Sequence, residues 1–138
     1  MAKEFLTLTE TETQMIGETF ALSLSLGDVL CLEGPIGAGK TQFVKGLARG
    51  LGFLGEVTSP TFPLIHEYEN HPIFLVHCDF FRLDCGVAVE ELGINEYLRQ
   101  AVLVIEWGSK FPALLPSNTQ IILFKILKGG KRHITFFA

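Results

Sequence analysis

Apolar residues recur at helical spacing in two stretches of the first half of the chain, and each stretch predicts an amphipathic helix. The first helix is expected over about residues 11–25, and Thr9 and Glu12 have the spacing of a capping box at its start. The second is expected to begin at Lys40 and to close at Gly50 and Gly52. The two apolar faces consist of Met15, Ile16, Phe20 and Leu24, and of Phe43, Val44, Leu47, Ala48 and Leu51.

Short apolar runs typical of strands account for most of the remaining pattern. The run at residues 29–32 leads into glycines and then into the second helix, which predicts a strand, glycine loop, helix unit. Residues 89–98 predict one further short helix. Later strands are expected at about residues 63–67, 73–78, 101–105, 121–126 and 133–137. The opening unit indicates an α/β fold, and the scarcity of later helices favours a mixed, mainly parallel central sheet flanked by helices.

Length and composition indicate one domain over residues 1–138. The chain is 48% hydrophobic and 19% charged, which suits a compact core without disulfides. The formal net charge of −4 provides no basic field for direct nucleic-acid binding, so a partner is expected to hold any RNA or DNA.

The three cysteines lack a C-x-x-C spacing and are expected to be free thiols in a reducing compartment. No stretch is long and apolar enough to predict a membrane span, and the first residues do not resemble a signal peptide. We therefore expect a cytoplasmic protein with no membrane partner.

The segment Gly-Pro-Ile-Gly-Ala-Gly-Lys-Thr at residues 34–41 is a full match to the phosphate-binding pattern G-x-x-x-x-G-K-[ST]. Its glycines allow the backbone to curl around phosphates at the N-terminus of a helix. Lys40 is expected to reach the β- and γ-phosphates of a nucleotide, and the Thr41 hydroxyl to bind Mg²⁺. The dinucleotide pattern G-x-G-x-x-G fails here, because Gln42 stands where glycine is required.

Two acidic residues, Asp79 and Glu106, directly follow predicted buried strands and are candidate metal ligands or catalytic residues. Because Mg²⁺ prefers one or two carboxylates beside waters and phosphate oxygens, the sequence leaves open which of the two binds it directly. His77, Arg82 and Trp107 stand beside them, and for each of the three a structural role competes with a functional one.

In the loop at residues 58–62, the hydroxyls of Ser59 and Thr61 are suited to sensing the γ-phosphate. A proline-containing turn explains this loop equally well.

Besides an ATPase, the residues alone leave a small-molecule kinase and a nucleotide-gated interaction module as alternatives. A kinase is disfavoured because the four arginines are widely spread, and a GTPase because N-K-x-D is absent. The nucleotide-gated module remains an alternative, since the sequence shows no obvious general base and no clear arginine finger beyond Arg82.

The motifs, taken in order, resemble the TsaE (formerly YjeE) family of tRNA threonylcarbamoyladenosine biosynthesis ATPases. They are the glycine loop, T-S-P-T-F at 58–62, H-C-D-F-F-R at 77–82, E-L-G at 91–93 and I-E-W at 105–107, within a resemblance over about residues 4–134. The resemblance implies a P-loop domain that binds ATP and Mg²⁺ and hydrolyses ATP when assembled with TsaD and TsaB. That complex modifies adenosine 37 of tRNAs that read codons starting with A, so tRNA is contacted only indirectly.

The resemblance also implies roles by position, with Lys40, Asp79 and Glu106 as catalytic residues and Thr41 and Glu106 as metal ligands. Nucleotide contacts are expected at Ile36, Gly37, Ala38, Gly39, Lys40 and Thr41, at Glu10 and Thr13, and at Lys131 or Arg132. Two positions depart from the family, since Pro35 replaces an acidic residue and Phe81 a tyrosine. Neither departure removes a phosphate or metal ligand.

Overall fold

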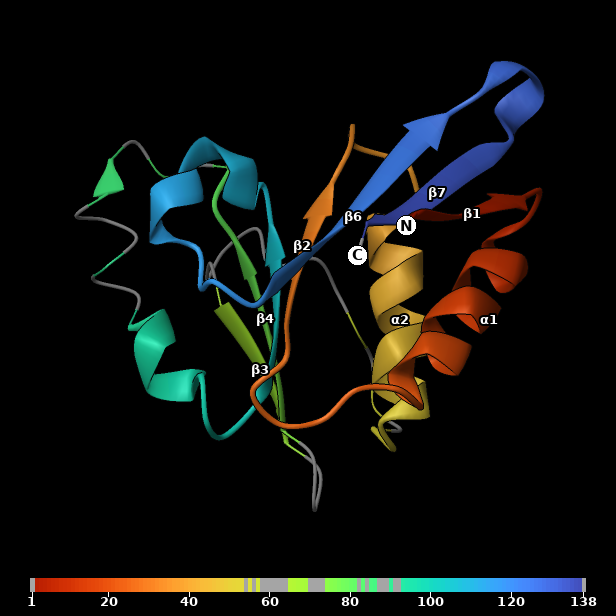
Figure 1. Cartoon of the computed structure of the whole chain (residues 1–138). Helices are drawn as coiled ribbons and strands as arrows, with labels where there is room; N and C mark the ends of the chain where they lie inside the picture. Colours follow the sequence, from red (N-terminus) through yellow and green to blue (C-terminus); the bar gives the residue numbers. More distant parts are fainter. Residues whose placement is uncertain are drawn as a thin grey trace.

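A computed structural model of the chain describes residues 2–53, 55, 57, 65–69, 74–81, 83, 85, 86, 90 and 93–137. Seven strands of this described part form one sheet in the order β1-β7-β6-β2-β5-β4-β3 (Figure 1). The strands are β1 (Ala2–Thr7), β2 (Val29–Glu33), β3 (Ile65–Glu69), β4 (Phe74–Asp79), β5 (Val102–Glu106), β6 (Thr119–Ile126) and β7 (Arg132–Phe137). The helices are α1 (Glu10–Ala21) and α2 (Lys40–Gly50), with 3-10 turns η1 (Ile94–Tyr97), η2 (Gly108–Lys110), η3 (Pro112–Leu114) and η4 (Lys128–Gly130).

The centre of the sheet is parallel and its edges are antiparallel. Strands β6, β2, β5 and β4 are parallel neighbours, whereas β7 pairs antiparallel with β6 and with β1, and β3 pairs antiparallel with β4. All five residues of β5 are buried, as expected for a parallel strand covered on both faces. The predicted mixed, mainly parallel sheet is confirmed.

Helices α1 and α2 pack against each other on one face of the sheet (Figure 1). Glycine allows this close approach, because a Cβ on Gly46 would lie 1.8 Å from the backbone oxygen of Gln14. Gln14 also hydrogen-bonds Gln42 (Nε2 to Oε1, 2.7 Å), and Ala21 lies beside Gly50 at the other end. The two helices therefore run parallel, and both N-termini lie at the end of the sheet where β2 leads into the glycine loop.

The opposite face of the sheet is covered by the 3-10 turns between β4 and β6. A second apolar cluster forms there, with Ile94 from η1 and Phe80 after β4 packed against the buried side chains of β5. The central strands are thus covered on both faces, and the carboxyl ends of these parallel strands form the base of a site.

Most predicted elements are confirmed within one or two residues, including a helix that begins at Lys40 and ends at Gly50. Helix α1 ends at Ala21, earlier than predicted, because the next three N–H groups, of residues 22–24, bond carbonyls three residues back and tighten the chain. Strand β1 was not predicted, because it lacks alternation and is defined by its pairing with β7. Of the helix expected at residues 89–98, residue 90 is helical and residues 94–97 form η1, while residues 89, 91 and 92 lie outside the described residues. Residues 63, 64 and 73 of two predicted strands lie outside them as well.

All three cysteines are free, as predicted. Within the described part of the chain, the helices are too short or too polar to cross a membrane.

Candidate functional site

The glycine loop joins β2 to α2 and needs glycine at specific positions. Gly34, Gly37 and Gly39 have φ values of +143°, +84° and +104°, which residues with a side chain rarely adopt. A Cβ on Gly34 would also lie 2.3 Å from the backbone oxygen of Phe124 in β6. Gly39 is the N-cap of α2 and offers no capping side chain, so the first N–H groups of the helix remain suited to an anion.

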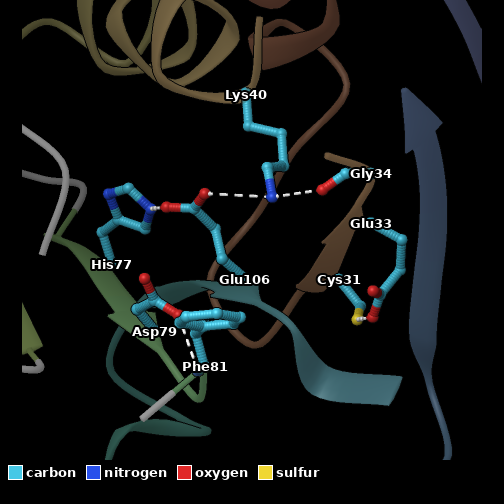
Figure 2. Close-up of polar contacts among 8 residues, drawn as sticks. All are labelled: Cys31, Glu33, Gly34, Lys40, His77, Asp79, Phe81 and Glu106. Atoms are coloured by element: carbon cyan, nitrogen blue, oxygen red, sulfur yellow. Dashed lines mark hydrogen bonds and ion pairs between the residues drawn. The ribbon is translucent and has the colours of Figure 1, made fainter. Parts of the chain in front are cut away.

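Lys40 opens helix α2, and its side chain is only 6% exposed. Its Nζ donates to the Gly34 carbonyl oxygen at 2.6 Å and lies 3.8 Å from Glu106 Oε1 (Figure 2). The same ammonium lies 4.4 Å from the centroid of the Trp107 ring, within the range of a cation–π contact. The loop lysine is therefore held between its own loop and the carboxyl end of β5.

Glu106 ends β5 and is buried beside His77 of the neighbouring strand β4. His77 Nε2 and Glu106 Oε2 are 2.7 Å apart (Figure 2), while His77 Nδ1 has no hydrogen-bond partner among the described residues. Burial alone would raise the pKa of Glu106, but the hydrogen bond to His77 and the charges of His77 and Lys40 outweigh it and lower this pKa. Glu106 is therefore an ionised carboxylate at neutral pH, which is the form that a metal ion requires.

Asp79 ends β4 directly opposite Glu106 in the parallel ladder. Its Oδ1 accepts the backbone N–H of Phe81 at 2.8 Å (Figure 2). Partial burial raises the pKa of Asp79 and the nearby Glu106 charge adds to this, against the opposing effect of the Phe81 N–H. The two neighbouring strand ends thus present carboxyl groups with different tendencies to bind a proton.

These groups line one cavity of about 520 Å³, a volume within the usual range for small-molecule sites. Most of the residues predicted to contact nucleotide or metal meet there. The predicted residues in its lining are Glu10, Thr13, Ile36, Gly37, Gly39, Lys40, Thr41, Asp79, Glu106 and Arg132. The structure thus brings together residues from both ends of the chain.

A few predicted residues lie elsewhere. Ala38 is fully buried and does not line the cavity, and Lys131 is exposed outside it. Of the pair Lys131 and Arg132, it is Arg132 that reaches the loop, donating from Nε to the Gly37 carbonyl oxygen at 3.2 Å. Ser59 and Thr61, with their proposed γ-phosphate contacts, lie outside the described residues, and so does Arg82.

Sequence reasoning did not assign a role in the site to several further lining residues, which are Leu8, Thr9, Gln42 and Gly130. It also missed Thr7, whose hydroxyl lies 2.8 Å from that of Thr13 in a buried pair. Thr7 belongs to the unpredicted strand β1, so no local signal pointed to it. Trp107 and Phe81 were noted in the sequence, and their rings meet with centroids 5.1 Å apart at the cavity wall.

The residues present fit a magnesium ion. Thr41 and Glu106 line the same cavity, and Glu106 is the carboxylate whose pKa is lowered. The described residues contain no cluster of three histidine, cysteine or acidic side chains that would suggest a metal held by the protein alone. A hydroxyl with one or two carboxylates is instead the donor set typical of magnesium bound together with phosphate oxygens.

The fold and the cavity define a protein of the P-loop class, with a glycine loop between a parallel strand and a helix and an acidic strand end beside the loop lysine. The family model for threonylcarbamoyl adenosine biosynthesis protein TsaE matches residues 7–134. The chain belongs to this family and hence to tRNA threonylcarbamoyladenosine biosynthesis.

Known relatives and a solved structure agree with this assignment. A tRNA threonylcarbamoyladenosine biosynthesis protein TsaE from Bacillus subtilis (strain 168) is 41% identical over 133 residues, covering 96% of this chain and 83% of that protein. Its counterpart from Treponema pallidum (strain Nichols) is 40% identical over 125 residues, covering 90% and 92%. The crystal structure of Bacillus subtilis YdiB superposes with a TM-score of 0.81 at 35% identity, covering 99% of this chain and 84% of that one.

Proposed function

We propose that this protein binds ATP with Mg²⁺ in the cavity beside the glycine loop and hydrolyses it, working with TsaD and TsaB in the threonylcarbamoylation of adenosine 37 in tRNAs that read codons starting with A. The observation that carries the proposal is the placement of Lys40 and Glu106, with Nζ and Oε1 3.8 Å apart, beneath a loop whose glycines adopt positive φ. Family membership supports the place of this chemistry in tRNA modification.

The residues of the chain have distinct parts in the proposed reaction. The first N–H groups of α2 and the Lys40 ammonium would bind the phosphates, with Lys40 exchanging the Gly34 carbonyl for phosphate oxygens. Thr41 and Glu106 would hold the magnesium ion, which supplies neutralisation of phosphate charge when bound. Glu106 is kept ionised and fixed in place by its hydrogen bond to His77.

Asp79 is the candidate group to orient the attacking water. Its Oδ1 is occupied by the Phe81 N–H, which leaves Oδ2 to accept a proton. Because burial raises the pKa of Asp79, this carboxylate is a better proton acceptor than an exposed aspartate.

Dependence on a partner is supported by the charges around the cavity. In the described part of the chain, Lys40 and Arg132 are the cationic side chains that line it. Arg132 already donates to the carbonyl oxygens of Gly37 and Gly130. A cation that stabilises the transition state would therefore come from Arg82, which lies outside the described residues, or from a partner, and with a partner-supplied cation hydrolysis by the isolated chain is expected to be slow.

The test is phosphate release from ATP and Mg²⁺, measured for the protein alone and with TsaD and TsaB. We expect the rate to rise on mixing, and Lys40→Ala to abolish both ATP binding and the rise, while Lys125→Ala on the exposed part of β6 behaves as wild type. An unchanged rate on mixing, with ATP binding intact, would favour the nucleotide-gated module. Transfer of labelled γ-phosphate to a metabolite instead of water would favour a kinase.

A further inference from the structure

The turn after β5 holds Trp107 in an unusual backbone conformation. Trp107 is the non-glycine residue with positive φ in the described part of the chain, at +61°. Such a conformation is unfavourable for a residue with a side chain and persists only where surrounding contacts enforce it. The indole forms a cavity wall with Phe81 and lies against the Lys40 ammonium, so the position of this turn matters for the site.

Two charged side chains, from Glu33 and Lys110, form hydrogen bonds that connect the turn after β5 to its neighbours. Glu33 at the end of β2 accepts the Ser109 backbone N–H on Oε1 at 2.7 Å. On the other side, Lys110 Nζ donates to the carbonyl oxygens of Phe81 and Leu83 at 2.7 and 2.8 Å. Lys110 therefore joins the turn after β5 to the segment after β4.

This connection begins where the sheet ends. Among the described residues, the backbone link that follows the paired residues of β4 and β5 runs from the Phe80 N–H to the Glu106 carbonyl oxygen at 2.9 Å. Beyond it, the Lys110 ammonium bridges the two segments with two charge-assisted hydrogen bonds, which are stronger than neutral ones. Phe81, whose carbonyl it holds, is also the residue whose N–H binds Asp79.

We propose that Lys110 is a positioning residue of this site. It fixes the position of the Phe81 and Trp107 rings and, through the Phe81 N–H, the orientation of the Asp79 carboxylate. Lys110 does not itself line the cavity, but it contacts the lining residue Phe81 through that residue's carbonyl oxygen. Its expected effect on turnover rests on the proposed function, whereas its effect on Trp107 does not.

The test compares Lys110→Met, which keeps the length of the side chain without a donor, with Lys110→Arg, whose guanidinium is able to donate to two carbonyls. Lys125→Met, at an exposed lysine of β6, is the matched control. Trp107 is the single tryptophan of the chain, so acrylamide quenching of intrinsic fluorescence reports on it directly in the nucleotide-free protein. The second readout is the kcat and KM of ATP hydrolysis in the presence of TsaD and TsaB.

We expect Lys110→Met to make Trp107 more accessible to quencher and to lower kcat about tenfold with KM nearly unchanged, because the loop and Lys40 still bind the phosphates. Lys110→Arg should restore both readouts, and Lys125→Met should match wild type in both. Wild-type quenching in Lys110→Met would overturn the proposal, and so would an arginine variant as impaired as the methionine variant. If the wild-type complex hydrolyses no ATP, the proposed function fails, and the quenching comparison still tests whether Lys110 positions Trp107.

Discussion

Replacing His77 by phenylalanine tests how much the buried contact between His77 and Glu106 contributes to stability. His77 is fully buried in β4, and its Nε2 lies 2.7 Å from Glu106 Oε2. Phenylalanine keeps a ring of similar size and removes the hydrogen-bond donor. Glu106 then retains Lys40, with Nζ 3.8 Å from Oε1, as its charged neighbour.

The loss of stability in His77→Phe depends on whether the Glu106 carboxylate stays ionised or binds a proton. Losing one partner of a buried pair typically costs about 3–5 kcal/mol. Glu106 has a second route, because it is able to bind a proton, and its ordinary pKa is 4.5. Each pH unit above this value adds about 1.4 kcal/mol to the cost of staying protonated, so at pH 7 this route costs about 3.4 kcal/mol, and the stabilisation that came from the lowered wild-type pKa is lost in addition. For a domain of this size, we expect the melting temperature to fall by roughly 10 °C.

The pH dependence gives the sharper test. The pKa of Glu106 is lowered in the folded protein, so its ionised form stabilises the fold above pH 4.5, and this contribution is lost as the pH falls through the lowered pKa. In His77→Phe the carboxyl becomes protonated at higher pH. The stability difference between wild type and variant should therefore shrink by about 2 kcal/mol between pH 7 and pH 5.5.

Urea unfolding followed by Trp107 fluorescence at pH 7 and pH 5.5 measures both differences. His77→Gln, which keeps a side-chain N–H donor, should recover part of the loss. His133→Gln is the matched control, because the 3.4 Å contact of His133 with Glu4 lies at the surface and should contribute about 1 kcal/mol or less. A loss in His77→Phe that is equal at the two pH values would refute the reasoning.

Three further changes test the helix packing and the site. Gly46→Ala should destabilise the fold by about 1–3 kcal/mol although alanine is the better helix former, because its Cβ would clash with the Gln14 carbonyl; chemical denaturation checks this, and a stabilised variant would contradict it. Asp79→Asn should raise the melting temperature at pH 7, since burial disfavours the Asp79 charge, while partner-stimulated phosphate release falls; a lower melting temperature would speak against a raised Asp79 pKa. Thr41→Val should leave Mg²⁺-free ATP binding within about twofold and weaken the Mg²⁺-dependent increment about tenfold, as followed by calorimetry; equal losses with and without Mg²⁺ would remove Thr41 from the metal site.

The N-terminal half shows how much of this molecule is encoded locally. The strand, glycine loop and helix at residues 29–50 were predictable, because glycine at positive φ and a lysine at a helix N-terminus depend on neighbours in the chain. The parallel core was predictable from continuous apolar runs, since central strands bury both faces. The strand-end carboxylates Asp79 and Glu106 followed from the same pattern.

Pairing between distant segments lay beyond such reasoning. Strand β1 exists because its six residues pair with β7 at the far end of the chain, and this brings Thr7 to Thr13 beside the glycine loop. The choice between Lys131 and Arg132 likewise depended on which side chain faces that loop.

By itself, the sequence determined which chemical groups the site contains, because a phosphate-binding loop is a local backbone structure with its ligands built in. The tertiary structure alone decided how those groups differ from one another. Strand order places Glu106 against His77 and Lys40 and leaves Asp79 with a backbone N–H, so two carboxylates that look alike in sequence acquire opposite pKa shifts. Burial and charge act through space, and residues 29 positions apart become neighbours only when the sheet has formed.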